Sequence, residues 1–305
     1  MKASSPLIII GGHGFIGSCF AARAIAAGRE VHRVGRRVAE NAGVRDWHWG
    51  EGEALVRAVA GRAPVIVDLA YSTVPSTSFG DPVGDFTANL GAVIHHLQFA
   101  TSVEAAAFLY VSSGGTVYGD AICLPLTEDS PTRPISPYGI TKLAGEHYTL
   151  MHHRLGLPVM IARPSNIYGP GQIARAGQGL VAAAFAAARS RSMITVFGDG
   201  SQRRDYLYID DFCSALDALL EHGENGATYN VGSGVGVSTT QLMALIDAIV
   251  AKEGHRLRIT HANARPFDVN ANILDSSRIA AATHWRASTE LIEGLERSWN
   301  WTLGR

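Results

Sequence analysis

Residues 8–20 read IIIGGHGFIGSCF, an apolar run that breaks into glycines spaced G-x-x-G-x-x-G. Glycine has no Cβ atom, so it permits tight turns and the close approach of other groups. A strand over 7–10 and a helix from about residue 14 would leave backbone N–H groups and the positive end of a helix facing outward. Such a loop suits a pyrophosphate, so we predict a dinucleotide site rather than a merely tight turn. The residues of this predicted site are Gly11, Gly14, Phe15, Ile16 and Gly17.

The composition limits the class of protein. The 305 residues carry 26 Lys plus Arg and 27 Asp plus Glu, so no basic footprint indicates nucleic acid as a partner. Cys19, Cys123 and Cys213 are odd in number and have no metal-ligand spacing, so we expect thiols in a reducing compartment and no metal site. No segment approaches the ~20 apolar residues of a membrane span. We therefore expect a cytoplasmic protein without a membrane partner.

Short apolar runs alternate with longer helical patterns in the first half of the chain. The predicted strands are 7–10, 30–34, 65–69, 108–112 and 158–162, and the predicted helices are 14–27, 85–101 and 137–155. This alternation predicts an α/β protein with a doubly wound parallel sheet of the Rossmann type.

The pattern loosens from about residue 165, where Gly-rich loops separate helices and short strands. No linker-like tract marks a second independent domain. We therefore predict a dinucleotide-binding domain over 1–164, to which later segments return, and a smaller, mainly helical substrate-binding lobe over 165–305.

The end of the second predicted strand bears on the choice of cofactor. An NAD site usually places Asp or Glu there for the ribose hydroxyls, but this chain reads Val34-Gly35-Arg36-Arg37. Guanidinium groups can hold a 2′-phosphate that a carboxylate would repel. We therefore favour NADP and keep NAD as possible. The alternative for Arg36 and Arg37 is a solvated loop pair.

The stretch SPYGITKLAGE, residues 136–146, places Tyr138 and Lys142 four residues apart after a Pro-led helix start. At that spacing both side chains project from one helical face. A tyrosine with a pKa near ~10 is a poor base at neutral pH, and a nearby ammonium group would lower that pKa. The chain has 26 Lys plus Arg, yet its only lysines are Lys2, Lys142 and Lys252. The pair could take a proton from a substrate hydroxyl as its hydride leaves.

Further motifs follow in order along nearly the whole chain. They are GGHGFIG (11–17), VSSGGTVYG (111–119), SPYGITK (136–142), ARPSNIYGPGQ (162–172), VFGDGSQRRDYLYIDD (196–211), YNVGSG (229–234) and RPFD (265–268). With them the chain resembles the extended short-chain dehydrogenase/reductase family, in particular its NAD(P)-dependent nucleotide-sugar epimerase/dehydratase branch of the UDP-glucose 4-epimerase type.

The resemblance implies roles for individual positions. Tyr138 would be the acid/base, and Lys142 would hold the cofactor ribose and tune Tyr138. The other positions implied near the cofactor are Ala70, Asn89 and Pro164. The positions implied to bind a nucleotide-diphosphate sugar are Asn166, Arg204, Tyr206, Arg265 and Asp268, with the arginines on the diphosphate. The resemblance also implies a homodimer formed through the helices at 85–101 and 137–155, and a setting in polysaccharide or glycan precursor synthesis.

The chain departs from these relatives at Gly114, where the epimerases usually have the Ser or Thr that bonds the reacting sugar oxygen. We expect Thr116 to replace that hydroxyl, with Ser113 as second choice; alternatively, the glycine makes room for a bulkier sugar. The 4,6-dehydratases carry an Asp-Glu pair where this chain has Gly115 and Thr116. Without an acid to protonate the leaving hydroxyl, dehydration is not expected.

Two reactions remain for the same residues. The motif series favours 4-epimerisation through a transient 4-keto sugar, whereas the Gly35-Arg36-Arg37 stretch favours NADPH-dependent reduction of a 4-keto sugar. We place the epimerase first and the reductase second. A catalytically silent NADP-binding sensor is a third reading, but such a protein would be expected to lose Tyr138 or Lys142. A reductase of steroids or flavonoids would not need Arg204 and Arg265 to converge.

Overall fold

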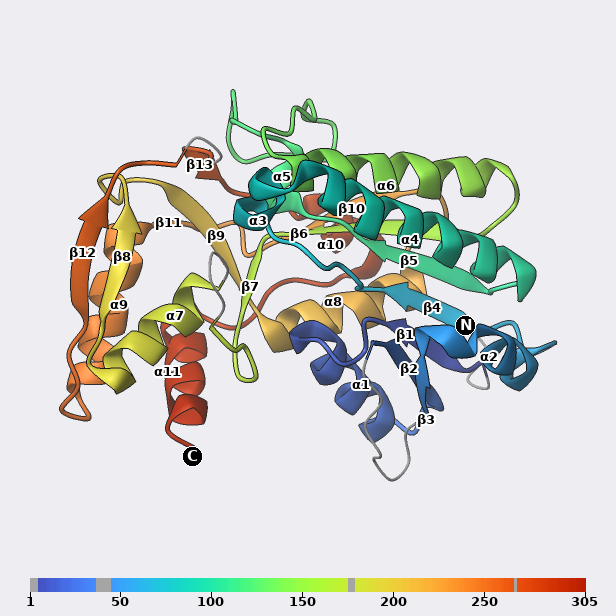
Figure 1. The fold of residues 1–305 in the computed structure, drawn as a ribbon, viewed down its shortest axis with the longest axis horizontal. Helices are drawn as coiled ribbons and strands as arrows, with labels where there is room; N and C mark the ends of the chain where they lie inside the picture. The colour runs from blue at the N-terminus through green and yellow to red at the C-terminus, as the bar shows by residue number, and fades with distance from the viewer. Residues whose placement is uncertain (1–4, 37–44, 175–178, 266–267) are drawn as a thin grey trace.

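A seven-stranded parallel sheet forms the centre of the larger part of the molecule (Figure 1). The structure is a computed structural model that describes residues 5–36, 45–174, 179–265 and 268–305. The strands stand in the order β10-β6-β5-β4-β1-β2-β3, and every neighbouring pair is parallel. Their bounds are β1 (Leu7–Ile10), β2 (Val31–Gly35), β3 (Arg45–His48), β4 (Val65–Asp68), β5 (Ala107–Val111), β6 (Val159–Pro164) and β10 (Thr228–Val231).

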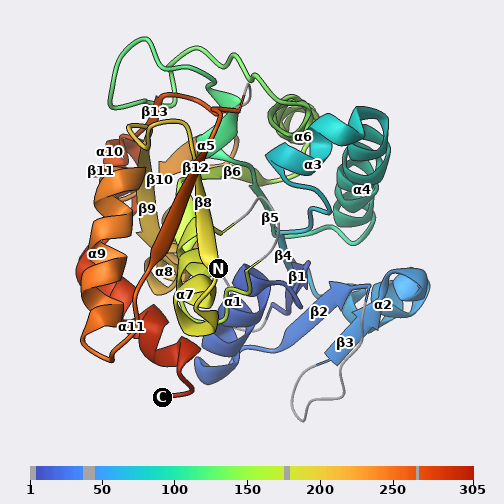
Figure 2. The same cartoon turned by 60° about the vertical axis from the view of Figure 1, so that its left-hand side comes forward.

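Helices cover both faces of this sheet (Figures 1 and 2). One face carries α1 (Phe15–Ala26) and α8 (Ile209–His222), and the other carries α4 (Pro82–Ser102) and α6 (Pro137–Arg154), with α2 (Gly52–Val59) toward the β3 edge. Alternate residues of the strands serve the two layers, because successive side chains of a strand point to opposite faces. In β1, Leu7 and Ile9 pack with Phe20 of α1, whereas Ile8 and Ile10 belong to the core beneath α2 and α4. The predicted doubly wound sheet is confirmed.

The two long helices of the second face begin at built caps. Asp81 accepts a hydrogen bond from the amide of Gly84 at the start of α4, and Ser136 accepts one from Gly139 at the start of α6. A proline follows each cap as the first helical residue, where its missing N–H costs nothing. These caps fix where α6 begins and therefore where Tyr138 stands above the strand ends.

A smaller lobe, on the left of Figure 1, is built from the later part of the chain. It contains α7 (Leu180–Ser190), α9 (Thr239–Ala251) and α11 (Leu291–Thr302). One small sheet joins β9 (Arg203–Tyr208) to β7 (Asn166–Tyr168), β11 (Gly236–Ser238) and β13 (Ala271–Asn272), and another pairs β8 (Met193–Phe197) with β12 (Arg258–Ala262).

Segments from beyond residue 165 also belong to the large sheet. β10 pairs with β6 at the sheet edge, α8 covers one face, and α10 (Ser277–Thr283) packs against both of them. The division of binding roles between 1–164 and 165–305 stays a prediction.

Two short helices complete the set close to the strand ends. α3 (Pro75–Gly80) follows β4, and α5 (Gly114–Val117) follows β5. Both pack against α6, which brings three loops together above the carboxyl ends of β4, β5 and β6. In open α/β sheets this edge is where ligands bind.

Candidate active site

The glycine loop between β1 and α1 has the shape of an anion-binding turn. Gly11 has a φ of +80°, and a Cβ atom on it would lie 2.9 Å from the amide nitrogen of Ala70. A Cβ atom on Gly17 would collide with the carbonyl oxygen of Gly11. Gly14, the exposed N-cap of α1, has no side-chain cap, and the first turn carries no acidic residue. The positive end of the helix is therefore open to an anion, and the loop fits a pyrophosphate.

The remaining two residues of the predicted loop site begin α1. Phe15 and Ile16 are half-buried and pack against the core, so their side chains secure the helix. Their amides belong to the first turn of the helix, where N–H groups have no acceptor within the helix. These two residues can therefore serve an anionic ligand through the backbone.

His13 lies where the loop meets the end of β2. A Cβ atom on Gly35 would stand 2.7 Å from His13 Nδ1, so the imidazole occupies the space that a longer side chain at position 35 would need. His13 Nε2 lies 3.3 Å from a carboxylate oxygen of Asp46, which Arg33 holds through two hydrogen bonds of 2.7 and 2.8 Å. Arg36 is exposed beside this group. Arg37 lies outside the described residues.

The loop that follows β4 is fixed by Asn89 of α4. Asn89 Oδ1 accepts hydrogen bonds from the amide and the hydroxyl of Ser72, and its Nδ2 donates to Thr73 and to the carbonyl of Asp85. At the start of the loop, the amide of Ala70 donates to Asp68 Oδ1. Asn89 therefore shapes the loop opposite Gly11, with its own amide group fully engaged.

Tyr138 and Lys142 lie on one face of α6, as predicted from their spacing, and the Lys142 ammonium group is buried. Lys142 Nζ donates to the carbonyl of Val111 over 2.8 Å and lies 4.2 Å from the centre of the Tyr71 ring. That ring packs edge-on against Tyr138, with the ring centres 4.7 Å apart. Tyr71 thus joins the pair, and the only signal for it in the sequence is a tyrosine that follows a predicted strand.

The pKa values of Tyr138 and Lys142 differ from our expectation. Burial raises the pKa of Tyr138 to about 12, although a hydrogen bond with the side chain of Ser113 acts to lower it. Burial lowers the pKa of Lys142 to about 8, while nearby carboxylates oppose that change. We expected the ammonium group to lower the pKa of Tyr138. The structure instead directs Lys142 Nζ at Val111 and Tyr71, and desolvation of the phenol dominates.

Ser113, the N-cap residue of α5, is the hydroxyl that contacts Tyr138. Thr116, our first choice, donates instead to the carbonyl oxygen of Ser113 over 3.4 Å. A Cβ atom on Gly114 would lie 2.6 Å from Leu274 Cδ1 and 2.9 Å from the carbonyl oxygen of Arg163. Packing beneath α5 therefore accounts for the glycine, and the alternative that it makes room for a bulkier sugar stays a prediction.

The predicted sugar-nucleotide residues lie on β7 and β9 and in the segment before β13. Arg204 of β9 is desolvated, which lowers its pKa, and Tyr206, Arg265, Asp268 and Asp120 act on its charge. Burial raises the pKa of Tyr206 to about 12. The structure therefore groups Arg204, Tyr206, Arg265 and Asp268 near one another.

Two predicted residues have their polar groups engaged by the protein. Arg265 donates to both oxygens of Asp268, over 2.8 and 2.9 Å, and stacks 4.2 Å from the centre of the Phe197 ring. Asn166 Nδ2 donates to the carbonyl of Asp205 over 3.1 Å. A diphosphate on Arg265 would therefore compete with Asp268 for the guanidinium group.

Pro164 is the last residue of β6 and is buried, opposite Val231 of β10. Because the strands are parallel, it lies at the same end of the sheet as the carboxyl ends of β1 and β4. It therefore lies at the carboxyl ends of the strands, as do the glycine loop after β1 and helix α5 after β5.

The described parts of the chain also bear on a membrane span and on a metal site. In those residues no helix is long and apolar enough to cross a membrane. The same residues hold no cluster of three or more His, Cys, Asp or Glu side chains that could bind a metal ion.

Comparison with known proteins defines the class that this fold and site represent. Residues 7–232 match the family described as the NAD dependent epimerase/dehydratase family. The chain belongs to this family of NAD-dependent enzymes, which act on nucleotide sugars in the relatives found.

Among its relatives is a UDP-glucose 4-epimerase of Mycolicibacterium smegmatis, 30% identical, with 95% of this chain and 96% of that protein covered. A dTDP-glucose 4,6-dehydratase of Xanthomonas campestris is 28% identical, over 97% of this chain and 92% of that protein. The crystal structure of a UDP-glucose 4-epimerase from Thermotoga maritima, with UDP-glucose, superposes with a TM-score of 0.91 at 28% identity, over 98% and 99% of the two chains. The resemblance inferred from the motifs is confirmed at the level of the family.

Proposed function

We propose that this protein is a nucleotide-sugar 4-epimerase in which Tyr138 is the acid/base and Ser113 binds the reacting sugar oxygen. The observation that carries the proposal is the contact between the Ser113 and Tyr138 side chains above the carboxyl end of β5, with Lys142 one helical turn away. A sugar hydroxyl placed between the two could give its proton to one and keep a hydrogen bond from the other.

The glycine loop after β1 would hold a nicotinamide cofactor, which would supply reversible hydride transfer with the sugar. The role of the chain is to hold the sugar and move one proton. The phenolate form of Tyr138 would take the proton of the 4-hydroxyl as the 4-keto sugar forms, and the resulting phenol would give it back after that sugar has turned over. Ser113 would donate to the 4-oxygen throughout, which favours the charge that develops there.

Lys142 would hold the cofactor ribose, since its ammonium group lies buried at the end of β5 beside Tyr71. Arg204, with Tyr206 beside it, would bind the diphosphate because a desolvated cation gains most from an anionic partner. In the same lobe Asn166, Arg265 and Asp268 would line the nucleotide, with Asp268 orienting the arginine.

The proposal excludes dehydration for a chemical reason. Elimination of water needs an acid next to the leaving hydroxyl. Gly115 has no side chain, and the Thr116 hydroxyl already donates to the carbonyl of Ser113. Neither residue supplies the proton.

The second candidate is an NADPH-dependent reductase of nucleotide 4-keto sugars. Two features at the end of β2 favour it. Arg36 is exposed, and Gly35 has no side chain. NAD sites usually carry an acidic residue at this strand end, but here His13 fills the space that a side chain at position 35 would need. For either reaction we propose NADP as the preferred cofactor.

A homodimer is part of the proposal, formed through α4 and α6. Exposed apolar side chains on these helices and at the C-cap of α6 are Val83, Phe86, Ile140, Tyr148, Met151 and Leu155. Covering such a face with a second copy would remove apolar surface from water. Light scattering would read the mass, and a monomer at micromolar concentration would contradict this part.

The test of function uses purified protein with UDP-, dTDP- and GDP-hexoses and their 4-keto forms, each with NAD(H) or NADP(H). Nicotinamide absorbance and product chromatography are recorded together. Interconversion of two isomers without net change in absorbance supports the epimerase, and stoichiometric loss of NADPH with a 4-keto sugar supports the reductase instead. The Tyr138→Phe variant is the control, because it should retain cofactor binding and lose turnover. Turnover that survives in this variant would show that the base is assigned wrongly.

A further inference from the structure

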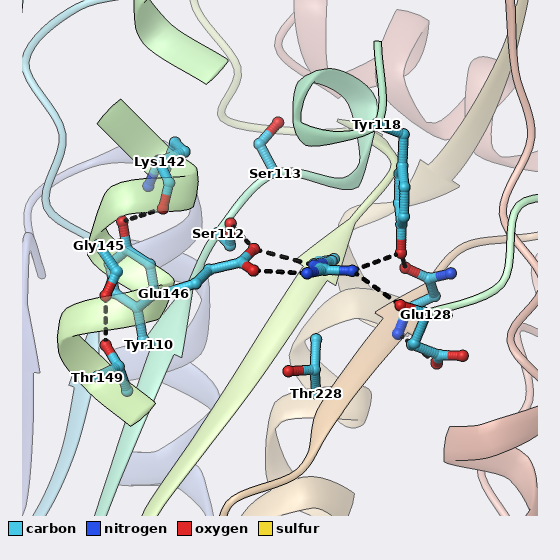
Figure 3. A network of polar contacts seen from close by, with 12 residues as sticks. Tyr110, Ser112, Ser113, Tyr118, Glu128, Lys142, Gly145, Glu146, Thr149 and Thr228 are labelled. Carbon is cyan, nitrogen blue, oxygen red and sulfur yellow. Dashed lines mark hydrogen bonds and ion pairs between the residues drawn. The ribbon is translucent and has the colours of Figure 1, made fainter. Parts of the chain in front are cut away.

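A buried ion pair lies directly behind the proposed catalytic residues. Arg163 of β6 donates from Nη2 to Glu146 Oε2 over 2.6 Å and from Nε to Oε1 over 3.0 Å, so the pair is bidentate. The exposed fractions of the two side chains are only 8% and 3%. The hydroxyl of Ser112, the residue before Ser113, also donates to Glu146 Oε1. Figure 3 shows Glu146 reaching from α6 toward this strand end.

The Nη1 atom of Arg163, which does not contact Glu146, is also held by hydrogen bonds. It donates to the hydroxyl of Tyr118 over 2.9 Å and to the carbonyl of Glu128 over 3.4 Å. The Tyr118 hydroxyl in turn donates to Asn230 Oδ1 over 2.7 Å. In Figure 3, Lys142 lies on one side of Glu146, and Tyr118 and Glu128 lie on the other. The arginine thus holds the carboxylate in one orientation from the side away from Lys142.

Glu146 stands one helical turn after Lys142, which stands one turn after Tyr138, so the three share a face of α6. The charged groups that act on the Lys142 ammonium group are Asp68 at the end of β4, Asp85 of α4 and Glu146 of α6. Two aromatic rings, Tyr71 and Tyr110, also face it, with Nζ 4.2 and 5.2 Å from their centres. Each of the three carboxylates also has another partner: Asp68 pairs with His96, Asp85 accepts from Thr73 and Thr141, and Glu146 pairs with Arg163.

A buried ion pair is weak evidence for stability, because the cost of desolvating two charges can exceed their attraction. An apolar pair of similar volume would often fold as well. Glu146, one turn after Lys142 and bonded to Ser112 at the end of β5, therefore calls for a second reason. The negative charge of Glu146 supplies such a reason, because a carboxylate near a buried lysine favours the protonated form of that lysine.

We propose that Glu146 is a positioning residue for this active site: locked by Arg163, its carboxylate keeps Lys142 protonated and, through Ser112, holds the end of β5 where Ser113 meets Tyr138. The inference rests on the proposed function for its catalytic consequence. Its electrostatic part concerns the protein alone and needs no substrate.

The test reads Lys142 directly. Because the chain has only three lysines, selective [ε-13C]lysine labelling gives few NMR signals, and a Lys142→Arg variant assigns the one of interest. Lys252, an exposed lysine paired with Glu296, is the internal reference. In the wild-type protein burial lowers the Lys142 pKa to about 8. We expect Glu146→Gln to lower it further, by about one pH unit, because the supporting charge is gone.

Two further variants keep the test decisive. Glu146→Gln leaves the Arg163 cation buried without its carboxylate, so Glu146→Gln/Arg163→Met, which removes both charges, is measured beside it. Asp211→Asn is the matched control, since Asp211 is also a buried carboxylate, which accepts from Ser288 and Thr289 beside α8. We expect the double variant to lower the Lys142 pKa and the control to leave it unchanged.

The kinetic readout follows from the same shift. In both Glu146 variants the alkaline limb of the kcat profile should move to lower pH by the amount that NMR measures, with little change in KM for the sugar nucleotide. An unchanged Lys142 pKa in the Glu146 variants would overturn the proposal even if activity fell. A lowered pKa without turnover in the wild-type protein would leave the electrostatic role standing and refute only the proposed function.

Discussion

The side chain of Ser113, the N-cap residue of α5, lies near enough to the side chain of Tyr138 on α6 to act on its pKa, which hydrogen bonding with Ser113 lowers and burial raises. This contact joins the end of β5 to the helix that carries Lys142. It selects one hydroxyl among those that follow the strand, because Thr116 is turned toward the carbonyl oxygen of Ser113.

Ser113→Ala should therefore lower kcat more than Thr116→Val does. Removing one donor aimed at a reacting oxygen typically costs about 100-fold in kcat, or somewhat more. Thr116→Val removes only a long bond to a carbonyl, so we expect less than about a threefold effect. Turnover measured at saturating substrate compares the two, and Ser113→Thr, which keeps the hydroxyl, should recover part of the loss. A larger loss in Thr116→Val would restore our first choice of hydroxyl.

Gly114→Ala should destabilise the protein. The new methyl group would meet Leu274, which is fully buried, and the carbonyl oxygen of Arg163, a backbone atom that cannot turn aside. Overpacking of this kind costs about 1–3 kcal/mol. Gly91→Ala on α4 is the matched control, because a Cβ atom there meets nothing within 4 Å and alanine favours a helix.

Urea unfolding measures both glycine variants. We expect the midpoint to fall for Gly114→Ala and to rise for Gly91→Ala. Equal or greater stability of Gly114→Ala would mean that packing does not require the glycine and that this position has spare room.

Lys142→Met should stabilise the protein at neutral pH. Burial holds the pKa of Lys142 at about 8, below its ordinary value of 10.5. Between these two pH values the folded protein binds fewer protons than the unfolded chain, so this lysine's contribution to stability improves as pH rises. Below pH 8 the folded protein carries the full cost of the buried charge, about 3 kcal/mol, offset by about 1 kcal/mol from the bond to Val111.

Unfolding free energies at pH 7 and pH 10 check this sign. The advantage of Lys142→Met should be largest at pH 7 and should have shrunk by pH 10. The methionine variant should also lose turnover, which would mark the lysine as kept for function at a cost in stability. An advantage that grows with pH would contradict a lowered pKa for Lys142.

The sequence predicted the sheet because its signal is local. Each strand such as Leu7–Ile10 is a buried apolar run, and the spacing to the next helix leaves a parallel crossover as the simple solution. That later segments return to this domain was predicted, but the pairing of β10 with β6 could not be predicted in this way. The four residues of β10, Thr228–Val231, follow α8, and nothing in them specifies β6 as the partner.

The candidate site was predictable where spacing alone determines geometry. Tyr138 and Lys142 share a helix, so their common face follows from the helical period. Ser113 and Thr116 lie at the turn into a one-turn helix, where the direction of each side chain depends on backbone angles that a motif does not encode. His13 and Tyr71 were missed for a related reason, since each acquires its place from an element distant in sequence, Asp46 for one and Tyr138 for the other.

Arg36→Ala tests the cofactor choice at the end of β2. If Arg36 binds a 2′-phosphate, its loss removes charge-assisted hydrogen bonds worth about 1.5–3 kcal/mol, which is about 10- to 100-fold in NADP affinity. NAD has no such phosphate, so its affinity should stay within about twofold. Arg57→Ala is the matched control, because Arg57 is an exposed arginine of α2 paired only weakly with Glu53, and it makes the same change in net charge. Fluorescence titration with NADP and with NAD gives the affinity of each variant relative to the wild-type protein. Equal losses of affinity for NADP and NAD would mean that Arg36 binds a part of the cofactor that both share. Unchanged affinity for both would mean that Arg36 is a solvated loop residue.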